Sequence, residues 1–155
     1  MITNNQAEHL NVMQGVNNMD KPLVQVNFSE VLLKEVSFNR PSSLGEEIYK
    51  IDVVDSIIID EVDAKSFKVI YIRENKGGTP FKFRVAFDFV TYLDEQGIEY
   101  YNGDLDKIKN FAEARKVEIV NNMGLAARAS LLIGNIAKEV GNPFITQPAV
   151  IVTKK

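Results

Sequence analysis

The sequence predicts an α+β fold, and the order of two kinds of pattern predicts it. Four segments rich in β-branched and aromatic residues fall within residues 24–93, and apolar residues at helical spacing follow only after them. The last of these segments alternates apolar with polar residues, which is typical of a sheet with one apolar and one polar face. Strands followed by helices, rather than alternating with them, indicate an α+β domain.

A single domain is the expectation for a chain of this size. It has 155 residues, of which 45% are hydrophobic, and this is enough to build one core. Residues 1–22 are rich in Asn, Gln and Asp, and they carry too little apolar surface to offset the entropy lost on ordering. We therefore expect a mobile polar tail at residues 1–22 and one domain at residues 23–155.

The first two strands differ in how regular they are. Residues 24–38 keep their apolar side chains mainly on even positions but are interrupted by Glu30 and Lys34, which predicts a long, twisted or bulged strand. Residues 48–60 place apolar side chains on odd positions, and their β-branched content favours a strand over a helix. Asp55 stands on this apolar parity and breaks the pattern.

The next two β-rich segments, residues 67–73 and 81–93, are predicted to form a hairpin. Turn residues Lys-Gly-Gly-Thr at positions 76–79 lie between them. The second segment separates its side chains by parity: Phe81, Phe83, Val85, Phe87 and Phe89 share one face, and Lys82, Arg84, Ala86 and Asp88 share the other. The phenylalanine face requires a cover.

Two helical segments supply that cover. Residues 105–119 repeat apolar side chains at helical spacing after Asp104, a predicted N-cap. Residues 125–140 form a second apolar stripe, which should stop at Gly141 with Pro143 behind it. We expect both helices to pack on the phenylalanine face of the sheet.

Charge and composition exclude several classes of partner. The formal net charge is −3 and the pI about 5.3, which argues against binding to nucleic acid phosphates. The chain has no cysteine, so disulfides and thiolate metal sites are excluded. The first residues lack the pattern of a signal peptide, and no run approaches the about 18 apolar residues that span a bilayer. The expectation is a cytoplasmic protein without membrane insertion.

No residue pattern indicates catalysis. His9, the only histidine, lies in the polar tail, where nothing would orient a general base. An acidic group between residues 52 and 63 does not have the spacing of a calcium loop, and a charged strand edge or turn explains it better. The sequence therefore predicts neither a catalytic site, nor a metal, nor a cofactor. An enzyme would need carboxylates that converge in a pocket.

Three segments resemble the SecB export chaperone family. Residues 34–41, KEVSFNRP, are similar to its first strand, and residues 79–89, TPFKFRVAFDF, to its last strand. Residues 122–150 contain GLAAR, similar to its helix, and GNPFITQP, similar to its helix-connecting loop. The resemblance ends there, before the family's C-terminal helix, which has no counterpart.

The resemblance implies a four-stranded antiparallel sheet with helices on one face, and a homo-oligomer that binds non-native chains without nucleotide. It places Phe83, Val85 and Phe87 at the subunit association surface. It also places a client groove between the loop after the first strand and the helix-connecting loop, which names Phe38, Leu44, Phe144 and Ile145. Apolar residues in such a groove can bind many sequences without reading any one of them.

The same resemblance identifies a partner-docking face on the polar side of the sheet, at Glu35, Asn39, Lys82 and Arg84. In the family, the export ATPase SecA docks there on acidic residues. Glu35 keeps an acid, but Asn39 replaces the next one, and Lys82 and Arg84 stand where the family has Leu and Glu. Positive charge in such a patch turns attraction into repulsion, so the sequence argues against docking of SecA.

Two hypotheses of function follow. The first is a SecB-like chaperone that binds unfolded or client polypeptides without nucleotide and need not serve secretion. The alternative is an adaptor or structural protein of the same fold, which oligomerises and binds one specific protein partner. Many heterogeneous clients would support the chaperone, and one stoichiometric partner the adaptor.

Overall fold

The computed structural model of the chain describes residues 24–39, 52–75, 81–139 and 151. The predicted tail at residues 1–22, the turn at residues 76–79 and the helix stop at Gly141 lie outside these ranges.

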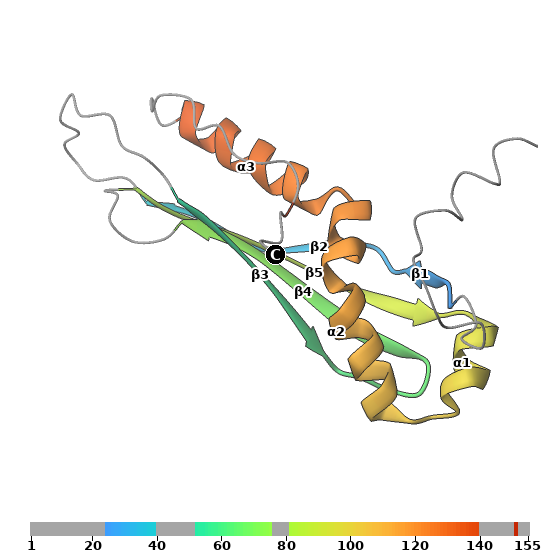
Figure 1. The fold of residues 1–155 in the computed structure, drawn as a ribbon. Coiled ribbons are helices and arrows are strands. Elements are labelled where there is room, and N and C mark those ends of the chain that lie inside the picture. Colours follow the sequence, from blue (N-terminus) through green and yellow to red (C-terminus); the bar gives the residue numbers. More distant parts are fainter. Residues whose placement is uncertain (1–23, 40–51, 76–80, 140–150, 152–155) are drawn as a thin grey trace, which may run out of the picture.

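One antiparallel sheet of five strands forms the centre of the molecule (Figure 1). Its strands are β1 (Val26–Phe28), β2 (Leu32–Asn39), β3 (Val53–Asp60), β4 (Ser66–Asn75) and β5 (Lys82–Leu93). The order across the sheet is β1-β5-β4-β3, and β2 pairs with β5 on the same edge as β1. The four predicted strands therefore lie side by side in the sheet. The first of them is divided into β1 and β2, which both pair with β5.

The first predicted strand is divided because the chain changes its pairing near Ser29. β1 runs along the end of β5, with Val26 opposite Leu93, and β2 runs along its beginning, from Leu32 opposite Asp88. Between them the Ser29 amide donates to Val90 O at 2.8 Å, and the Val90 amide donates to Ser29 Oγ at 2.8 Å. A side-chain oxygen thus continues the ladder across the gap. The predicted bulge is also present, between Leu33 and Glu35.

The alternation in β5 separates the two faces of the sheet. Phe83, Val85, Phe87 and Phe89 are all buried, as the parity predicts. Lys82 on the opposite parity is exposed and Arg84 is half-buried, whereas Asp88 is buried by its neighbours on the same face. We call the phenylalanine side the helix face and the other side the open face.

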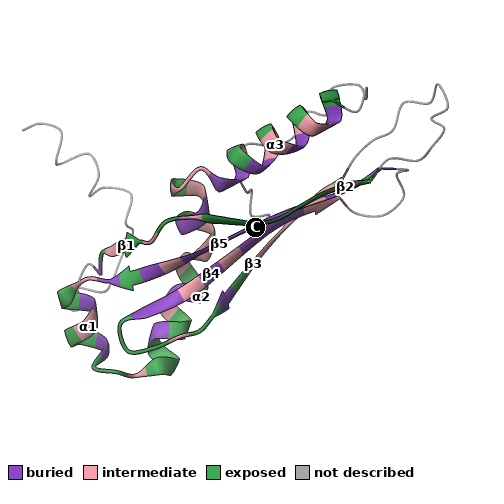
Figure 2. Cartoon of the chain, turned by 180° about the vertical axis from the view of Figure 1, so that it is seen from behind, coloured by how far each residue is buried: buried purple, intermediate pink, exposed green. Residues whose placement is uncertain are grey.

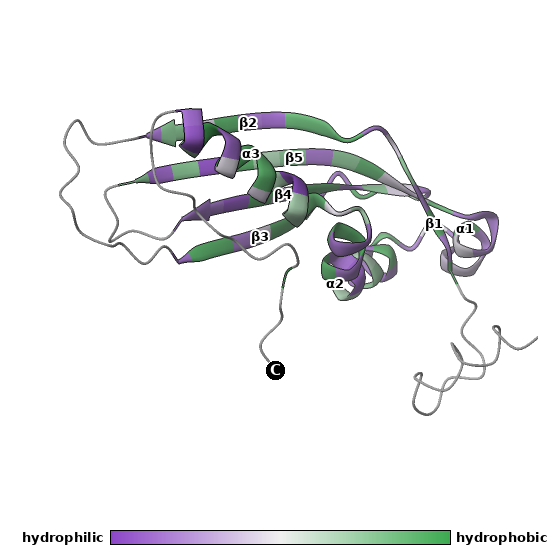
Figure 3. Cartoon of the chain, turned by 90° about the horizontal axis from the view of Figure 1, so that it is seen from above, coloured by the Kyte–Doolittle hydropathy of each residue, from purple (hydrophilic) through white to green (hydrophobic). Residues whose placement is uncertain are grey.

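Helices α2 (Leu105–Asn122) and α3 (Leu125–Glu139) lie on the helix face, as expected. Figure 3 shows α3 crossing the sheet obliquely, with α2 on the β3 side. The predicted N-cap is confirmed, because the Asp104 carboxylate accepts from the Lys107 amide at 3.1 Å. Gly124, with φ of +64°, turns the chain from α2 into α3.

A short helix that the sequence did not predict, α1 (Glu95–Tyr101), follows β5. Its N-cap is Asp94, whose carboxylate accepts from the Gly97 amide at 2.8 Å. Gly97 is required there, because a Cβ on it would stand 2.6 Å from Val24 Cγ1. The core lies between β4, β5 and the two long helices, and Figure 2 shows its buried residues against the exposed surface of β2. None of the described helices has the length and apolar content needed to span a membrane.

Candidate functional site

Exposed apolar side chains gather on the edge strands β1 and β2. Phe28, Leu32, Leu33 and Val36 are 39%, 50%, 49% and 38% exposed. They are four of the nine large apolar side chains that are exposed in the described part of the chain, and they fall within a short stretch of sequence. We call these four residues the edge strip. Single exposed apolar residues are ordinary, but such a grouping is typical of a binding surface.

The register places the edge strip on both sides of the sheet margin. Leu33 lies opposite Phe87 and Val36 opposite Val85, so these two side chains lie on the helix face. Phe28 is on the same face, where its ring meets the edge of the Phe89 ring at 6.0 Å between centroids. Leu32 lies opposite Asp88, on the open face. An extended chain along this margin would meet apolar groups above and below it.

The backbone of β2 is the second feature of this margin. Among the described residues, β2 pairs with β5 alone, so its other side offers backbone N–H and C=O groups. Two features limit uncontrolled pairing at such an edge: a bulge and a lysine. The bulge adjoins Lys34, whose Nζ is 3.8 Å from Asp88 Oδ2 and whose side chain is 54% exposed. Within the described strands the outer side of β2 is thus unpaired, and the bulge and Lys34 limit uncontrolled pairing there.

Of the four predicted groove residues, the structure describes Phe38 only. Its side chain is half-buried, lies opposite Phe83 and tilts against the Phe81 ring at 6.3 Å between centroids. It continues the line of Leu33 and Val36 on the helix face of β2. Leu44, Phe144 and Ile145 lie outside the described residues.

The three residues predicted at an association surface lie in the core of one chain. Phe83, Val85 and Phe87 are 3%, 0% and 1% exposed. Phe87 stacks on Tyr71, and the Arg128 guanidinium lies 5.2 Å over its ring. These side chains are covered by their own chain and offer no surface to a second copy. Parity identified them as apolar but could not distinguish a core from an interface.

The open face brings the four predicted docking residues together. Asn39 lies opposite Lys82, and Arg84 binds Glu35 with its Nε 3.0 Å from Oε2. A second acid, Glu74, receives Arg84 Nη1 at 2.6 Å. The hydrogen bonds that Arg84 donates to Glu74 and then to Glu35 raise the pKa of Arg84. Two acids thus balance two bases here, so Arg84 presents less free positive charge than the sequence alone suggested.

A hollow of about 740 Å³ on the open face is bordered by three of the predicted docking residues, Asn39, Lys82 and Arg84, but not by Glu35. Its described lining consists of Ser37, Asn39, Val54, Glu74, Asn75, Lys82, Phe83 and Arg84. The lining mixes polar, charged and apolar groups without a cluster of acids, and no group of three or more His, Cys, Asp or Glu that could hold a metal occurs in the described ranges. The described part of this face offers contacts for a polar partner.

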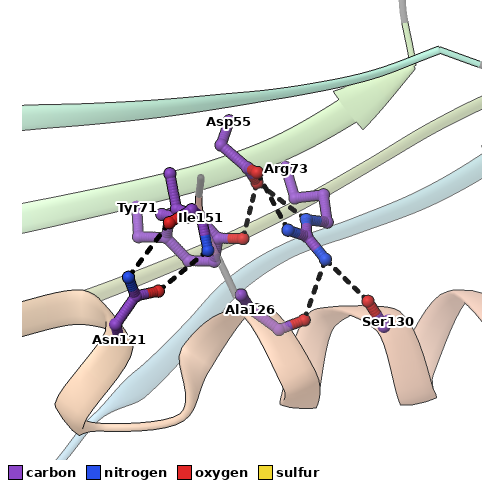
Figure 4. Close-up of polar contacts among 7 residues, drawn as sticks. All are labelled: Asp55, Tyr71, Arg73, Asn121, Ala126, Ser130 and Ile151. Atoms are coloured by element: carbon purple, nitrogen blue, oxygen red, sulfur yellow. Dashed lines mark hydrogen bonds and ion pairs between the residues drawn. The ribbon is translucent and has the colours of Figure 1, made fainter. Parts of the chain in front are cut away.

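A buried polar cluster beneath α3 was missed in the sequence (Figure 4). Arg73 is fully buried and binds Asp55 with two hydrogen bonds. Its Nη1 donates to Ala126 O at 3.0 Å and to Ser130 Oγ at 2.6 Å, which ties α3 to the sheet. Asp55, which broke the apolar parity, and Arg73, on the apolar parity of its own strand, are opposite each other. The available signal in the sequence was that Asp55 and Arg73, of opposite charge, both stand on apolar positions of neighbouring strands, which indicates a buried ion pair.

Tyr71 completes this cluster. Its hydroxyl donates to Asp55 Oδ1 at 2.7 Å. Burial, and then this hydrogen bond, raise the pKa of Tyr71 far above its ordinary value. The phenol therefore stays protonated and serves as a donor. Asp63, from the same acidic stretch of the sequence, has another role: it closes the turn between β3 and β4 by accepting from the amides of Lys65 and Ser66 at 2.7 Å each.

A second polar contact holds a residue from the end of the sequence. Asn121, in the last turn of α2, pairs with the backbone of Ile151 (Figure 4). Its Nδ2 donates to Ile151 O at 3.2 Å, and the Ile151 amide donates to its Oδ1 at 2.9 Å. Ile151 is half-buried and packs against the core.

Comparison with known proteins supports the fold. No family model matches the chain, and no curated protein matches it. Among solved structures, the chain resembles the SecB-like chaperone Rv1957 of Mycobacterium tuberculosis in complex with a ChAD peptide from the HigA1 antitoxin. The match has a TM-score of 0.51 at 9% identity and covers 84% of this chain and 92% of that one. A protein of unknown function from Streptococcus agalactiae matches 82% of this chain at 12% identity, but its TM-score of 0.35 is too low to indicate a shared fold. The chain therefore has an α+β fold like that of a SecB-like chaperone.

Proposed function

We propose that this chain is a chaperone that binds unfolded or extended client polypeptides without nucleotide and without a chemical step. The observation that carries the proposal is the edge strip, which gathers four exposed apolar side chains on β1 and β2, where β2 pairs with β5 alone among the described residues. The fold shared with a SecB-like chaperone supports it. Service in protein export is not part of the proposal.

In this proposal the backbone of β2 and its apolar side chains contribute to binding in different ways. An extended client can pair its backbone with the open side of β2, as peptides do when they add a strand to a sheet edge. Alternate client side chains then meet Leu33 and Val36 on one face and Leu32 on the other. Backbone pairing is the same for every sequence, and flat apolar contacts reject few side chains. Broad but weak selectivity follows.

The test is suppression of aggregation by the purified chain. A chemically denatured apolar protein is diluted into buffer without ATP, and light scattering is followed at a several-fold excess of the chain. We expect scattering to fall with added chain. Scattering that is unchanged at this excess would exclude the chaperone.

A matched pair of variants locates the site. Leu33→Asp with Val36→Asp places charge on the edge strip and should abolish most of the protection. Ile58→Asp with Leu105→Asp changes two apolar residues of similar or greater exposure away from the strip and should leave protection intact. Equal loss from both pairs would show that general surface hydrophobicity, not the edge strip, binds the client. Stoichiometric capture of one folded protein, with no effect on denatured clients, would favour the adaptor.

A further inference from the structure

The contact between Asn121 and Ile151 has the chemistry of a peptide-binding contact. One side-chain amide donates to the carbonyl and accepts from the N–H of the same residue, at 3.2 Å and 2.9 Å. A neighbouring strand would satisfy a residue in the same way. Because both hydrogen bonds go to the backbone of Ile151, they depend on the backbone of the bound residue and not on its side chain.

Its position suits a binding subsite. Asn121 lies where α2 meets α3 on the helix face, on the β3 side of the sheet. The edge strip lies on β1 and β2, at the margin of the sheet opposite β3 (Figure 3). The two sites therefore lie toward opposite margins of the same sheet, and one extended client chain can contact both.

The hold on Ile151 is of a kind that another chain can replace. In the described part of the structure, the backbone hydrogen bonds of Ile151 go to Asn121 alone, and the residue belongs to no strand. Its side chain is only half-buried against the core. A competing segment with an aliphatic side chain and a free N–H would offer the same groups.

We propose that Asn121 is the centre of a second client-binding subsite, which Ile151 occupies within the same chain and which client polypeptide takes over by displacing it. The Asn121 contact requires an extended backbone with a free N–H, and the packing of the Ile151 side chain against the core adds a preference for an aliphatic residue. It rejects proline, which has no N–H to donate to Asn121 Oδ1. This inference rests on the proposed function, because it assigns a second contact for the same client.

The experiment measures the affinity of the full chain for a fluorescein-labelled, permanently unfolded protein by anisotropy. Ile151→Pro removes the N–H that donates to Asn121 Oδ1 and so frees the subsite. Client should therefore bind several-fold more tightly. Ile151→Val keeps the N–H and most of the side chain and should match the parent. Asn121→Ala removes the subsite from both competitors, so client should bind several-fold more weakly. Asn122→Ala changes the exposed neighbour and should have no effect.

A subsite predicts that Ile151→Pro raises the affinity for client and Asn121→Ala lowers it. If Asn121 only anchors Ile151 within the chain, both variants lose the same contact, and their affinities should change in the same direction or not at all. If the parent binds the client and both variants equal it, Asn121 is an anchor only and the inference is overturned. If the parent binds no client, the proposed function fails.

A peptide assay keeps the test decisive should Asn121→Ala not fold. A synthetic peptide of residues 147–155 is added to the Ile151→Pro chain together with the labelled client. We expect the peptide to displace client, and the same peptide with Ile151→Pro to leave it bound. Absence of any effect from the first peptide would overturn the inference.

Discussion

The guanidinium of Arg73 lies along the carboxylate of Asp55, with Nε 2.7 Å from Oδ1 and Nη2 2.9 Å from Oδ2. The Arg73 side chain has no exposed surface, so this pair stands inside the core, between the sheet and α3. Removal of one partner leaves the other charge buried and unpaired, which costs far more than the pair contributes.

Asp55→Ala should therefore lower the free energy of unfolding by about 3–5 kcal/mol. Replacement of both partners by apolar residues, Asp55→Leu with Arg73→Met, should recover most of this loss, because no buried charge remains. Urea unfolding followed by circular dichroism gives both values. A loss below about 1 kcal/mol for Asp55→Ala would mean that water reaches Arg73.

Tyr71 gives the chain a dependence on alkaline pH. Its pKa is raised in the folded chain, by burial and then by the hydrogen bond to Asp55. A group of this kind stabilises the fold fully below its unfolded pKa of about 10, and the stabilisation is lost as pH rises above that value. The free energy of unfolding should fall above about pH 10, by at most about 1.4 kcal/mol per pH unit from this group.

Tyr71→Phe should be less stable at neutral pH but should show a shallower decline between pH 9 and 11. Urea unfolding at several pH values measures this slope. Tyr92→Phe, at an exposed ring on the open face, serves as control and should keep the parent slope. Identical slopes for the parent and Tyr71→Phe would contradict the assignment.

Ser29 continues the ladder between β1 and β2 with its side chain. Ser29→Ala leaves the Val90 amide without the acceptor that it has at 2.8 Å. We expect a loss of about 1–3 kcal/mol in unfolding free energy. Amide hydrogen exchange of Val90 should accelerate more than that of Val69 on the neighbouring strand β4. Uniform acceleration of both would indicate a global effect rather than a local joint.

Thr91 offers a stabilising substitution. It is fully buried, and its hydroxyl oxygen has no hydrogen-bond partner among the described residues. Thr91→Val keeps the shape and removes the hydroxyl, so we expect a gain of about 1 kcal/mol. Thermal unfolding measures it as a higher Tm. A lower Tm would show that the hydroxyl has a partner after all, such as a buried water.

Lys34 is expected to limit pairing of β2 with another chain, because its charged side chain is exposed beside the unpaired side of this strand. Lys34→Val removes the charge beside the bulge and extends the edge strip, so we expect concentration-dependent self-association. Sedimentation velocity of parent and variant over a tenfold range of concentration measures it. Lys107→Val, at an exposed lysine of α2, is the control. A monodisperse Lys34→Val chain would show that the bulge alone protects the edge.

The sequence was sufficient for the features that depend on periodicity. The parity of β5, the hairpin of β4 and β5, the two long helices and the Asp104 cap are all confirmed. Helix α1 was missed because Gly97 weakens a short helix, and only its close approach to Val24 explains the glycine. The division near Ser29 depends on a tertiary hydrogen bond to Val90, which no local pattern reveals.

The candidate site was less predictable than the fold. Phe38 was predicted as a groove residue, which stays a prediction, and Leu32, Leu33 and Val36 were read only as strand residues. Their exposure follows from the place of β2 at the edge of the sheet, which depends on the order of strands rather than on any residue in β2. The role of Asn121 was likewise invisible, since it rests on a contact with Ile151 far along the chain.

The pairing of β2 with β5 has a consequence for synthesis of the protein. The partner of Leu32 is Asp88 and the partner of Asn39 is Lys82, so both partners come much later in the chain. During translation, β2 leaves the ribosome well before the strand that will hold it. β4 and β5, which are close in sequence, can pair early, and β2 must close a long loop to join them. Until then the edge strip belongs to a nascent chain that itself has the features of a chaperone client.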